Sequence, residues 1–115
     1  MRQSQKEIPE DERPLAELFR IAAREWVDLD SAANLLEECK SAVLSERMQA
    51  LGNIPVSRAE LKVKASPEWR EYLQKMVEAR SAANLARVKM KWIEMRFSVW
   101  QSSEANQRAE VRLSR

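Results

Sequence analysis

A long stretch without helix-breaking residues constrains this chain more than any other feature. The only glycine, Gly52, and all four prolines lie at or before position 67, so nothing after Pro67 has to interrupt a helix. Ser66 is a good N-cap residue, Pro67 suits the first helical position, and Glu68 lies near the positive end of the helix dipole. The sequence therefore predicts a long helix over residues 67–108.

An apolar stripe at heptad spacing runs along this predicted helix. With Trp69 at heptad position a, every a and d position through Trp100 is apolar or aromatic, across nearly five heptads. The stripe consists of Trp69, Tyr72, Met76, Ala79, Ala83, Ala86, Met90, Ile93, Phe97 and Trp100. Such a stripe must be buried against a partner, which is either the rest of this chain or another copy of it.

A second apolar stripe lies roughly opposite the first, at the c and f positions. A helix that is apolar on two sides usually packs against two neighbours. The expected neighbours are the N-terminal helix on one side and another subunit, or a ligand, on the other. We therefore predict an oligomer interface at Leu85, Val88, Trp92, Met95 and Val99.

The composition fits one small helical domain. The chain has 115 residues, of which 33% are charged and 44% hydrophobic. No apolar run approaches the roughly 20 residues that span a bilayer, and no signal-peptide pattern opens the chain, so we expect no membrane partner. Cys39 is the only cysteine, which fits a reducing cytoplasm.

Turn and capping signals divide the chain into segments. Residues 1–13 are polar and predicted to be a disordered tail, followed by a single helical domain over residues 14–110 and a frayed C-terminus at 111–115. Within the domain we expect a helix over 14–51, a short helix over 58–65 opened by a capping box at Ser57, and the long helix. A cap near Asp30 leaves open whether the first helix breaks there. The predicted fold is all-α, an antiparallel hairpin of two long helices joined by a short helix and completed by homo-oligomerisation.

The charges are distributed unevenly along the chain. Residues 1–57 hold 7 Lys+Arg and 11 Asp+Glu, a net of −4, whereas residues 58–115 hold 13 and 7, a net of +6. The two halves can pair with each other, or the basic half can face a polyanion. We predict nucleic-acid contacts at Arg58, Lys62, Lys64, Arg87, Lys89, Lys91, Trp92 and Arg96. Trp92 lies between cations, as a stacking platform for single strands does, but Trp and Arg are equally typical of an oligomer hot spot.

The sequence contains none of the common catalytic motifs. It lacks a phosphate-binding loop, a dinucleotide fingerprint, a nucleophile elbow and paired cysteines, and it has no histidine. Adjacent carboxylates such as Glu37 and Glu38 point about 100° apart on a helix and form no acid/base pair. We predict a non-enzyme, with no catalytic residue, no metal site and no cofactor.

Part of the chain resembles a known group of proteins. The stretch from Ala59 through Ala65-Ser66-Pro67-Glu68-Trp69 to Trp100-Gln101-Ser102-Ser103-Glu104-Ala105-Asn106-Gln107-Arg108-Ala109-Glu110 resembles small helical early-region proteins of tailed bacteriophages. The order of elements also resembles that of phage recombination mediators, small helical oligomers that bind single-stranded DNA and load a recombinase. The resemblance implies that the protein acts in the cytoplasm of a bacterial host cell. The resemblance implies that Arg58, Lys62 and Lys64 correspond to the mediators' basic connector, although the connector of this chain is shorter.

Three hypotheses follow for the function. The first is a phage-type DNA-recombination accessory protein, a homo-oligomer that binds single-stranded DNA, a recombinase or a single-strand-binding protein. The second is a protein–protein interaction module that docks on a DNA-processing enzyme of phage or host without binding DNA itself. A plain coiled-coil scaffold is a third interpretation, and it would bind neither ligand.

Overall fold

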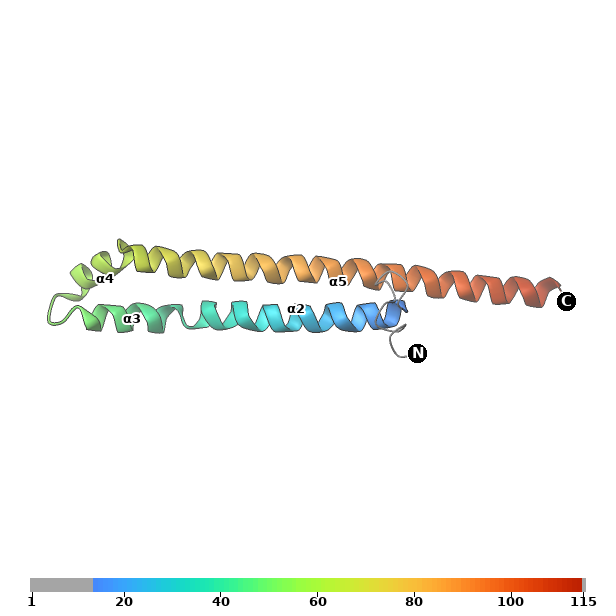
Figure 1. Cartoon of the computed structure of the whole chain (residues 1–115), viewed down its shortest axis with the longest axis horizontal. Helices are drawn as coiled ribbons and strands as arrows, with labels where there is room; N and C mark the ends of the chain where they lie inside the picture. The colour runs from blue at the N-terminus through green and yellow to red at the C-terminus, as the bar shows by residue number, and fades with distance from the viewer. Residues whose placement is uncertain (1–13, 115) are drawn as a thin grey trace, which may run out of the picture. The chain divides into compact units, whose positions relative to one another are not determined.

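The computed structural model describes residues 14–114, and these residues are all-α, as predicted from the sequence (Figure 1). Their helices are α2 (Leu15–Glu38), α3 (Lys40–Ala50), α4 (Val56–Lys64) and α5 (Pro67–Ser114). The predicted tail at 1–13 lies outside the described residues. The chain divides into two compact units, one of residues 27–84 and one in which the start of α2 meets residues 85–114 of α5.

In the unit of residues 27–84, α2 and α5 run side by side in opposite directions. The Leu36 carbonyl, late in α2, accepts a hydrogen bond from the Tyr72 hydroxyl, early in α5. Asp30, six residues earlier in α2, pairs with Arg80, eight residues later in α5. The partners thus move in opposite directions along the two helices, which is the predicted antiparallel hairpin. The helices α3 and α4 contact each other at the turn.

The first long helix is interrupted at Cys39 rather than at Asp30. The helix α2 continues through Asp30 to Glu38, and α3 begins at Lys40. Asp30 is held by Arg80 inside the helix, so its side chain is not free to cap a restart. At the interruption, the Leu36 carbonyl accepts its hydrogen bond from Tyr72 of α5. A bond from another helix therefore stabilises the chain next to the break.

The turn between α3 and α4 follows one sequence expectation and departs from another. Gly52 has a φ of 90°, a conformation that strains other residues, and its N–H donates to the Gln49 carbonyl as a helix C′ residue does. The helix α4 starts earlier than predicted, since the Pro55 carbonyl accepts from the Ala59 N–H at 2.9 Å. Ser57 consequently lies within the first turn, and no side chain caps this helix.

The predicted cap of the long helix is confirmed. The Ser66 Oγ accepts from the Trp69 N–H at 3.2 Å and donates to the Val63 carbonyl at 2.6 Å. One hydroxyl thus satisfies groups at the end of α4 and at the start of α5. The long helix runs to Ser114, past the predicted end at 108 and through the segment expected to fray.

In the unit that joins residues 14–26 to residues 85–114, a small apolar cluster holds α2 against α5. Its buried members are Ala22, Met90 and Ile93, and partly buried Leu18, Phe19, Ala23 and Trp26 pack around them. From Gln101 to Ser114 every side chain of α5 is exposed. The last turns of α5 therefore pack against no other described element.

The predicted heptad stripe is the packed face of α5. Nine of its ten residues are buried or partly buried, and only Trp100, at 50% exposure, lies mostly in solvent. Several of the most deeply buried side chains on α2 and α5 are alanines, at positions 22, 33, 83 and 86. Small residues let two helices approach closely, but they bury little apolar area. The core of each unit is accordingly thin.

Candidate functional site

The second stripe of α5 is uncovered in the single chain. Its five residues, all in the unit that contains 85–114, are exposed by between 53% and 72%. They follow one another at spacings of three and four residues, so they form one face over 15 residues of helix. Among the described residues no element covers this face. The residues of this second stripe are Leu85, Val88, Trp92, Met95 and Val99.

Cations lie along both sides of the second stripe. The helical period places Lys91 on one side of it and Lys89 and Arg96 on the other. The Arg96 guanidinium lies over the Trp92 ring, 4.9 Å from its centroid, which is a cation–π contact. Lys89 Nζ lies 3.9 Å from a Glu25 carboxylate oxygen of α2, a long and half-exposed ion pair.

The other predicted nucleic-acid residues are arranged less uniformly. Arg87 is exposed but lies further round the helix, away from the second stripe. Arg58, Lys62 and Lys64 are exposed on α4, in the other unit, where Lys64 pairs with Glu60 at 2.7 Å. The structure therefore gathers Lys89, Lys91, Trp92 and Arg96 on one part of α5, together with the predicted interface residues. Sequence reasoning alone could not decide between the two roles, because the same side chains serve both.

Arg80 is a further cation of α5, and its role is structural. Its guanidinium donates to the Asp30 carboxylate at 2.6 Å, to the Asn34 side chain at 2.6 Å and to both Glu37 carboxylate oxygens at 2.8 Å. These hydrogen bonds, first to Glu37 and then to Asp30, raise the pKa of Arg80 above its ordinary value. Arg80 also lowers the pKa of the Glu37 carboxyl by hydrogen bonding. The sequence signal for this network was the spacing of Asp30, Asn34 and Glu37, which puts three acceptors on one face of α2.

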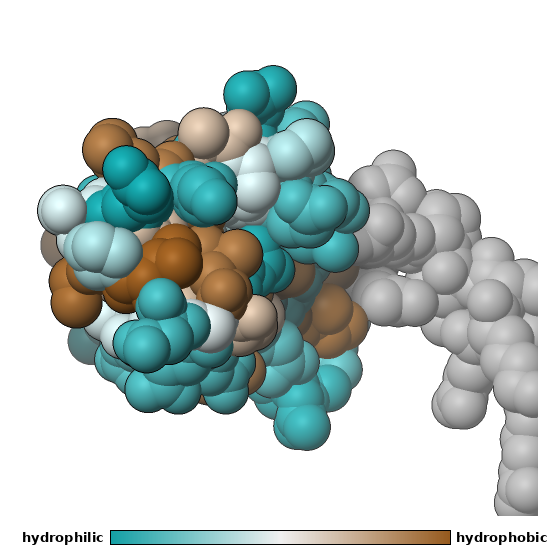
Figure 2. Space-filling view, turned by 90° about the vertical axis from the view of Figure 1, so that its left-hand side faces the viewer, coloured by the Kyte–Doolittle hydropathy of each residue, from teal (hydrophilic) through white to brown (hydrophobic). Residues whose placement is uncertain are grey.

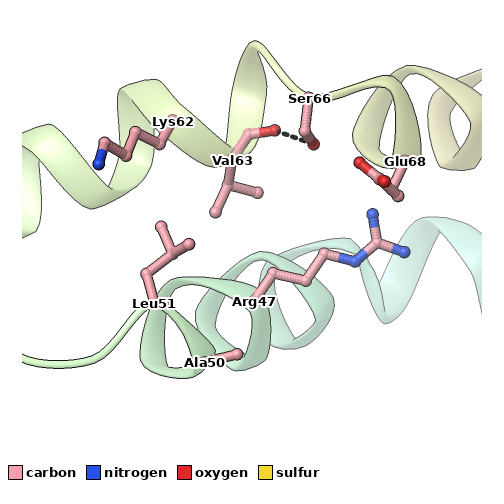
Figure 3. Close-up of a pocket in the computed structure, with 7 residues that line it drawn as sticks. All are labelled: Arg47, Ala50, Leu51, Lys62, Val63, Ser66 and Glu68. Atoms are coloured by element: carbon pink, nitrogen blue, oxygen red, sulfur yellow. Dashed lines mark hydrogen bonds between the residues drawn. The ribbon is translucent and has the colours of Figure 1, made fainter.

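A hollow of about 330 Å³ lies between α3, α4 and the start of α5 (Figure 3). Its lining is mostly apolar, with the charged side chains of Arg47, Lys62 and Glu68 around it. The Arg47 Nη1 is buried and has no hydrogen-bond partner among the described residues. The Arg47 side chain as a whole is only partly buried, so this atom does not define an anion site.

An apolar patch, bordered by hydrophilic side chains, also lies at the end of the hairpin at the α3–α4 turn (Figure 2). Leu51, Val56 and Leu61 are exposed in this part of the chain. They come from a turn and a nine-residue helix, with no regular spacing and no helical face in common. The second stripe of α5 is therefore the better-organised apolar surface.

No group of three or more His, Cys, Asp and Glu side chains within residues 14–114 is placed to hold a metal ion. Cys39 is partly buried at the α2–α3 junction. Over the same residues, no helix has the length and apolarity needed to cross a membrane. The predicted absence of enzymatic activity stays a prediction.

Comparisons with known proteins identify no relative of this chain. No protein-family model matches the chain, and neither the curated proteins nor the solved structures compared with it give a match. The resemblance to phage early-region proteins therefore rests on the sequence motifs quoted above.

Proposed function

We propose that this chain is a docking protein, which uses the second stripe of α5 to bind another protein. The observation that carries the proposal is the contrast between the two faces of one helix. Nine of the ten heptad-stripe residues are buried or partly buried, whereas five apolar residues on the other face are more than half exposed. Exposed apolar surface that is continuous and bordered by polar groups marks interaction sites on soluble proteins.

The composition of the second stripe supports a protein partner. Trp92 is the kind of large aromatic anchor that dominates binding energy at protein interfaces. Arginine, here Arg96 next to it, is also enriched among the residues that contribute most to such binding. Val88 and Met95 lie one turn away on either side of Trp92 and provide aliphatic surface around it. A nucleic-acid strand would leave those aliphatic side chains without a matching partner, since its backbone is charged.

The test compares which proteins bind with and without an intact second stripe. Tagged full-length chain is used in crosslinked pull-downs as wild type, as Val88→Glu with Met95→Glu, and as Val77→Glu. Val77 is 60% exposed on α5 but lies outside the second stripe, which makes it a matched control. We expect proteins recovered by wild type and Val77→Glu to be lost from the double variant. Identical recovery by all three would contradict the proposal.

Single-stranded DNA is the second candidate ligand, and the exposed Trp92 with Lys91 and Arg96 favours it. A base can stack on the ring while the cations neutralise phosphates, which would give the phage-type recombination accessory role predicted from the sequence. Anisotropy of a labelled oligo-dT at low and moderate salt tests this candidate. Binding that weakens steeply with salt and is lost in Lys89→Glu with Lys91→Glu would support it, whereas no binding at low salt would exclude it.

Self-association is also a prediction that the sequence makes for this face. The homo-oligomer would bury the second stripe of one copy against that of another, as expected for a hairpin with an uncovered side. A recombinase or single-strand-binding partner belongs to the same set of proposals, since each would occupy the same residues.

A further inference from the structure

We infer that the second stripe of α5 binds an amphipathic helix of another protein, one whose own apolar stripe is flanked by Asp and Glu. This inference rests on the proposed function and specifies the chemistry of the partner. It follows from three observations on the described residues: the spacing of the second stripe, the charge beside it, and the absence of a matching surface on this chain.

The spacing of the second stripe is that of a coiled-coil seam. From Leu85 to Val99 the intervals are three, four, three and four residues, which is the spacing of a and d positions along a heptad. The seam therefore extends for about 21 Å at ~1.5 Å per residue. A partner helix of slightly more than two heptads would cover it with its own a and d side chains.

The charge beside the seam has one sign. If Trp92 is given position a of this seam, Lys91 takes a g position, and Lys89 and Arg96 take e positions. Glu25 of α2 pairs with Lys89 at 3.9 Å, and Glu94 lies on the far side of α5 from the seam. Residues at e and g select partners by charge, so acidic residues on the partner would complete the interface.

A second copy of this chain fits the same seam poorly. In a parallel pair, Lys91 of one helix would lie opposite Arg96 of the other, and in an antiparallel pair like charges would again face each other. The exposed face of α2 is no better, because Asp28 lies between Ile21 and Leu35 where a seam needs an apolar residue. Within residues 14–114 no other exposed apolar set repeats the seam spacing.

The experiment uses two synthetic helical peptides of about three heptads, with Leu at the a and d positions and either Glu or Lys at the e and g positions. Each labelled peptide is titrated with the full chain and followed by fluorescence anisotropy. We expect the Glu peptide to bind at least about tenfold more tightly than the Lys peptide. Lys91→Glu with Arg96→Glu should reverse this order, and Val88→Glu with Met95→Glu should abolish binding, while Val77→Glu binds like wild type.

The outcomes separate the inference from the function on which it rests. Equal binding of both peptides that depends on Val88 and Met95 would overturn the acidic partner and leave the docking function standing. No binding of either peptide to a folded chain would count against both. A wild-type dimer in light scattering that Val88→Glu with Met95→Glu converts to a monomer would show the second copy as occupant. Displacement of the Glu peptide by oligo-dT would show that a nucleic acid binds the second stripe. The dimer result and the displacement result would each overturn the inference.

Discussion

Ser66 shows how a single hydroxyl can join two helices. It accepts from the Trp69 N–H and donates to the Val63 carbonyl, so it connects the end of α4 to the start of α5. Replacing a Ser N-cap by Ala usually costs about 1 kcal/mol. We expect Ser66→Ala to lower the free energy of unfolding by about this amount in urea denaturation. Ser66→Thr keeps the hydroxyl and is the control, and equal stability of Ser66→Ala and wild type would contradict the cap.

Glu37 makes the stability of the hairpin depend on pH at its acidic end. Its hydrogen bonds to Arg80 lower its pKa below the ordinary value of 4.5. A carboxylate with a lowered folded pKa contributes stability above its unfolded pKa, and this contribution is lost as the pH falls through the folded value. Asp30 faces the same guanidinium from the same helix.

Between about pH 5 and about pH 3, the thermal unfolding midpoint of wild type should fall more steeply than that of Glu37→Gln, which has no titrating group at position 37. Glu38→Gln is the matched control, because Glu38 is the adjacent exposed carboxyl. Thermal unfolding followed by circular dichroism at several pH values measures the slopes. Parallel curves for wild type and Glu37→Gln would show that the contact with Arg80 contributes nothing.

At the scale of elements, alanines set how closely α2 and α5 pack. Ala83 is fully buried on α5, whereas its neighbour Ala82 is exposed. Enlarging a side chain in a well-packed contact typically costs about 1–3 kcal/mol. Ala83→Leu should therefore destabilise the protein by an amount in this range in urea denaturation, and Ala82→Leu should leave the midpoint near that of wild type. If the two variants were equally stable, the helices would not be in close contact at Ala83.

The last turns of α5 lead to a different expectation. Residues 101–114 are exposed on every side, so their helix is not supported by packing within the described residues. Ala105→Pro should reduce the helical circular dichroism signal but change the free energy of unfolding by less than about 0.5 kcal/mol. Ala79→Pro, in the packed part of α5, should cost about 3 kcal/mol or more. A large loss of stability in Ala105→Pro would show that this segment packs on something else.

The sequence predicted elements best where one physical signal dominated. The heptad stripe identified the packed face of α5, and Ser66 and Gly52 marked boundaries because capping and positive φ are local requirements. The break at Cys39 was not predicted, since no glycine, proline or cap residue marks it. The hydrogen bond that supports it joins Leu36 to Tyr72, which lies 36 residues later in the chain. The prediction that Ser57 caps the short helix was wrong. Pro55 provides the first carbonyl of α4, which places Ser57 inside the helix.

At the scale of the whole molecule, periodicity shows that a face is apolar but not what covers it. Both stripes of α5 are regular in the sequence, and only the structure assigns one of them to the contact with α2. The ambiguity over Trp92 has the same origin, because a ring between cations suits a base, a second copy or a partner helix equally well in a sequence.

Introduced carboxylates should destabilise the protein strongly on the packed face of α5 and only slightly on the second stripe. Val88 and Met95 are 65% and 59% exposed, so Val88→Glu with Met95→Glu buries no charge and should change the free energy of unfolding by less than about 0.5 kcal/mol for each substitution. Met90→Glu with Ile93→Glu places carboxylates in the cluster around Ala22 and should leave the chain largely unfolded, because a buried unpaired charge is costly. Urea denaturation of both variants at two protein concentrations is the measurement. A loss of stability in the first variant that depends on protein concentration would mean that a second copy already covers this face, since only association makes stability depend on concentration.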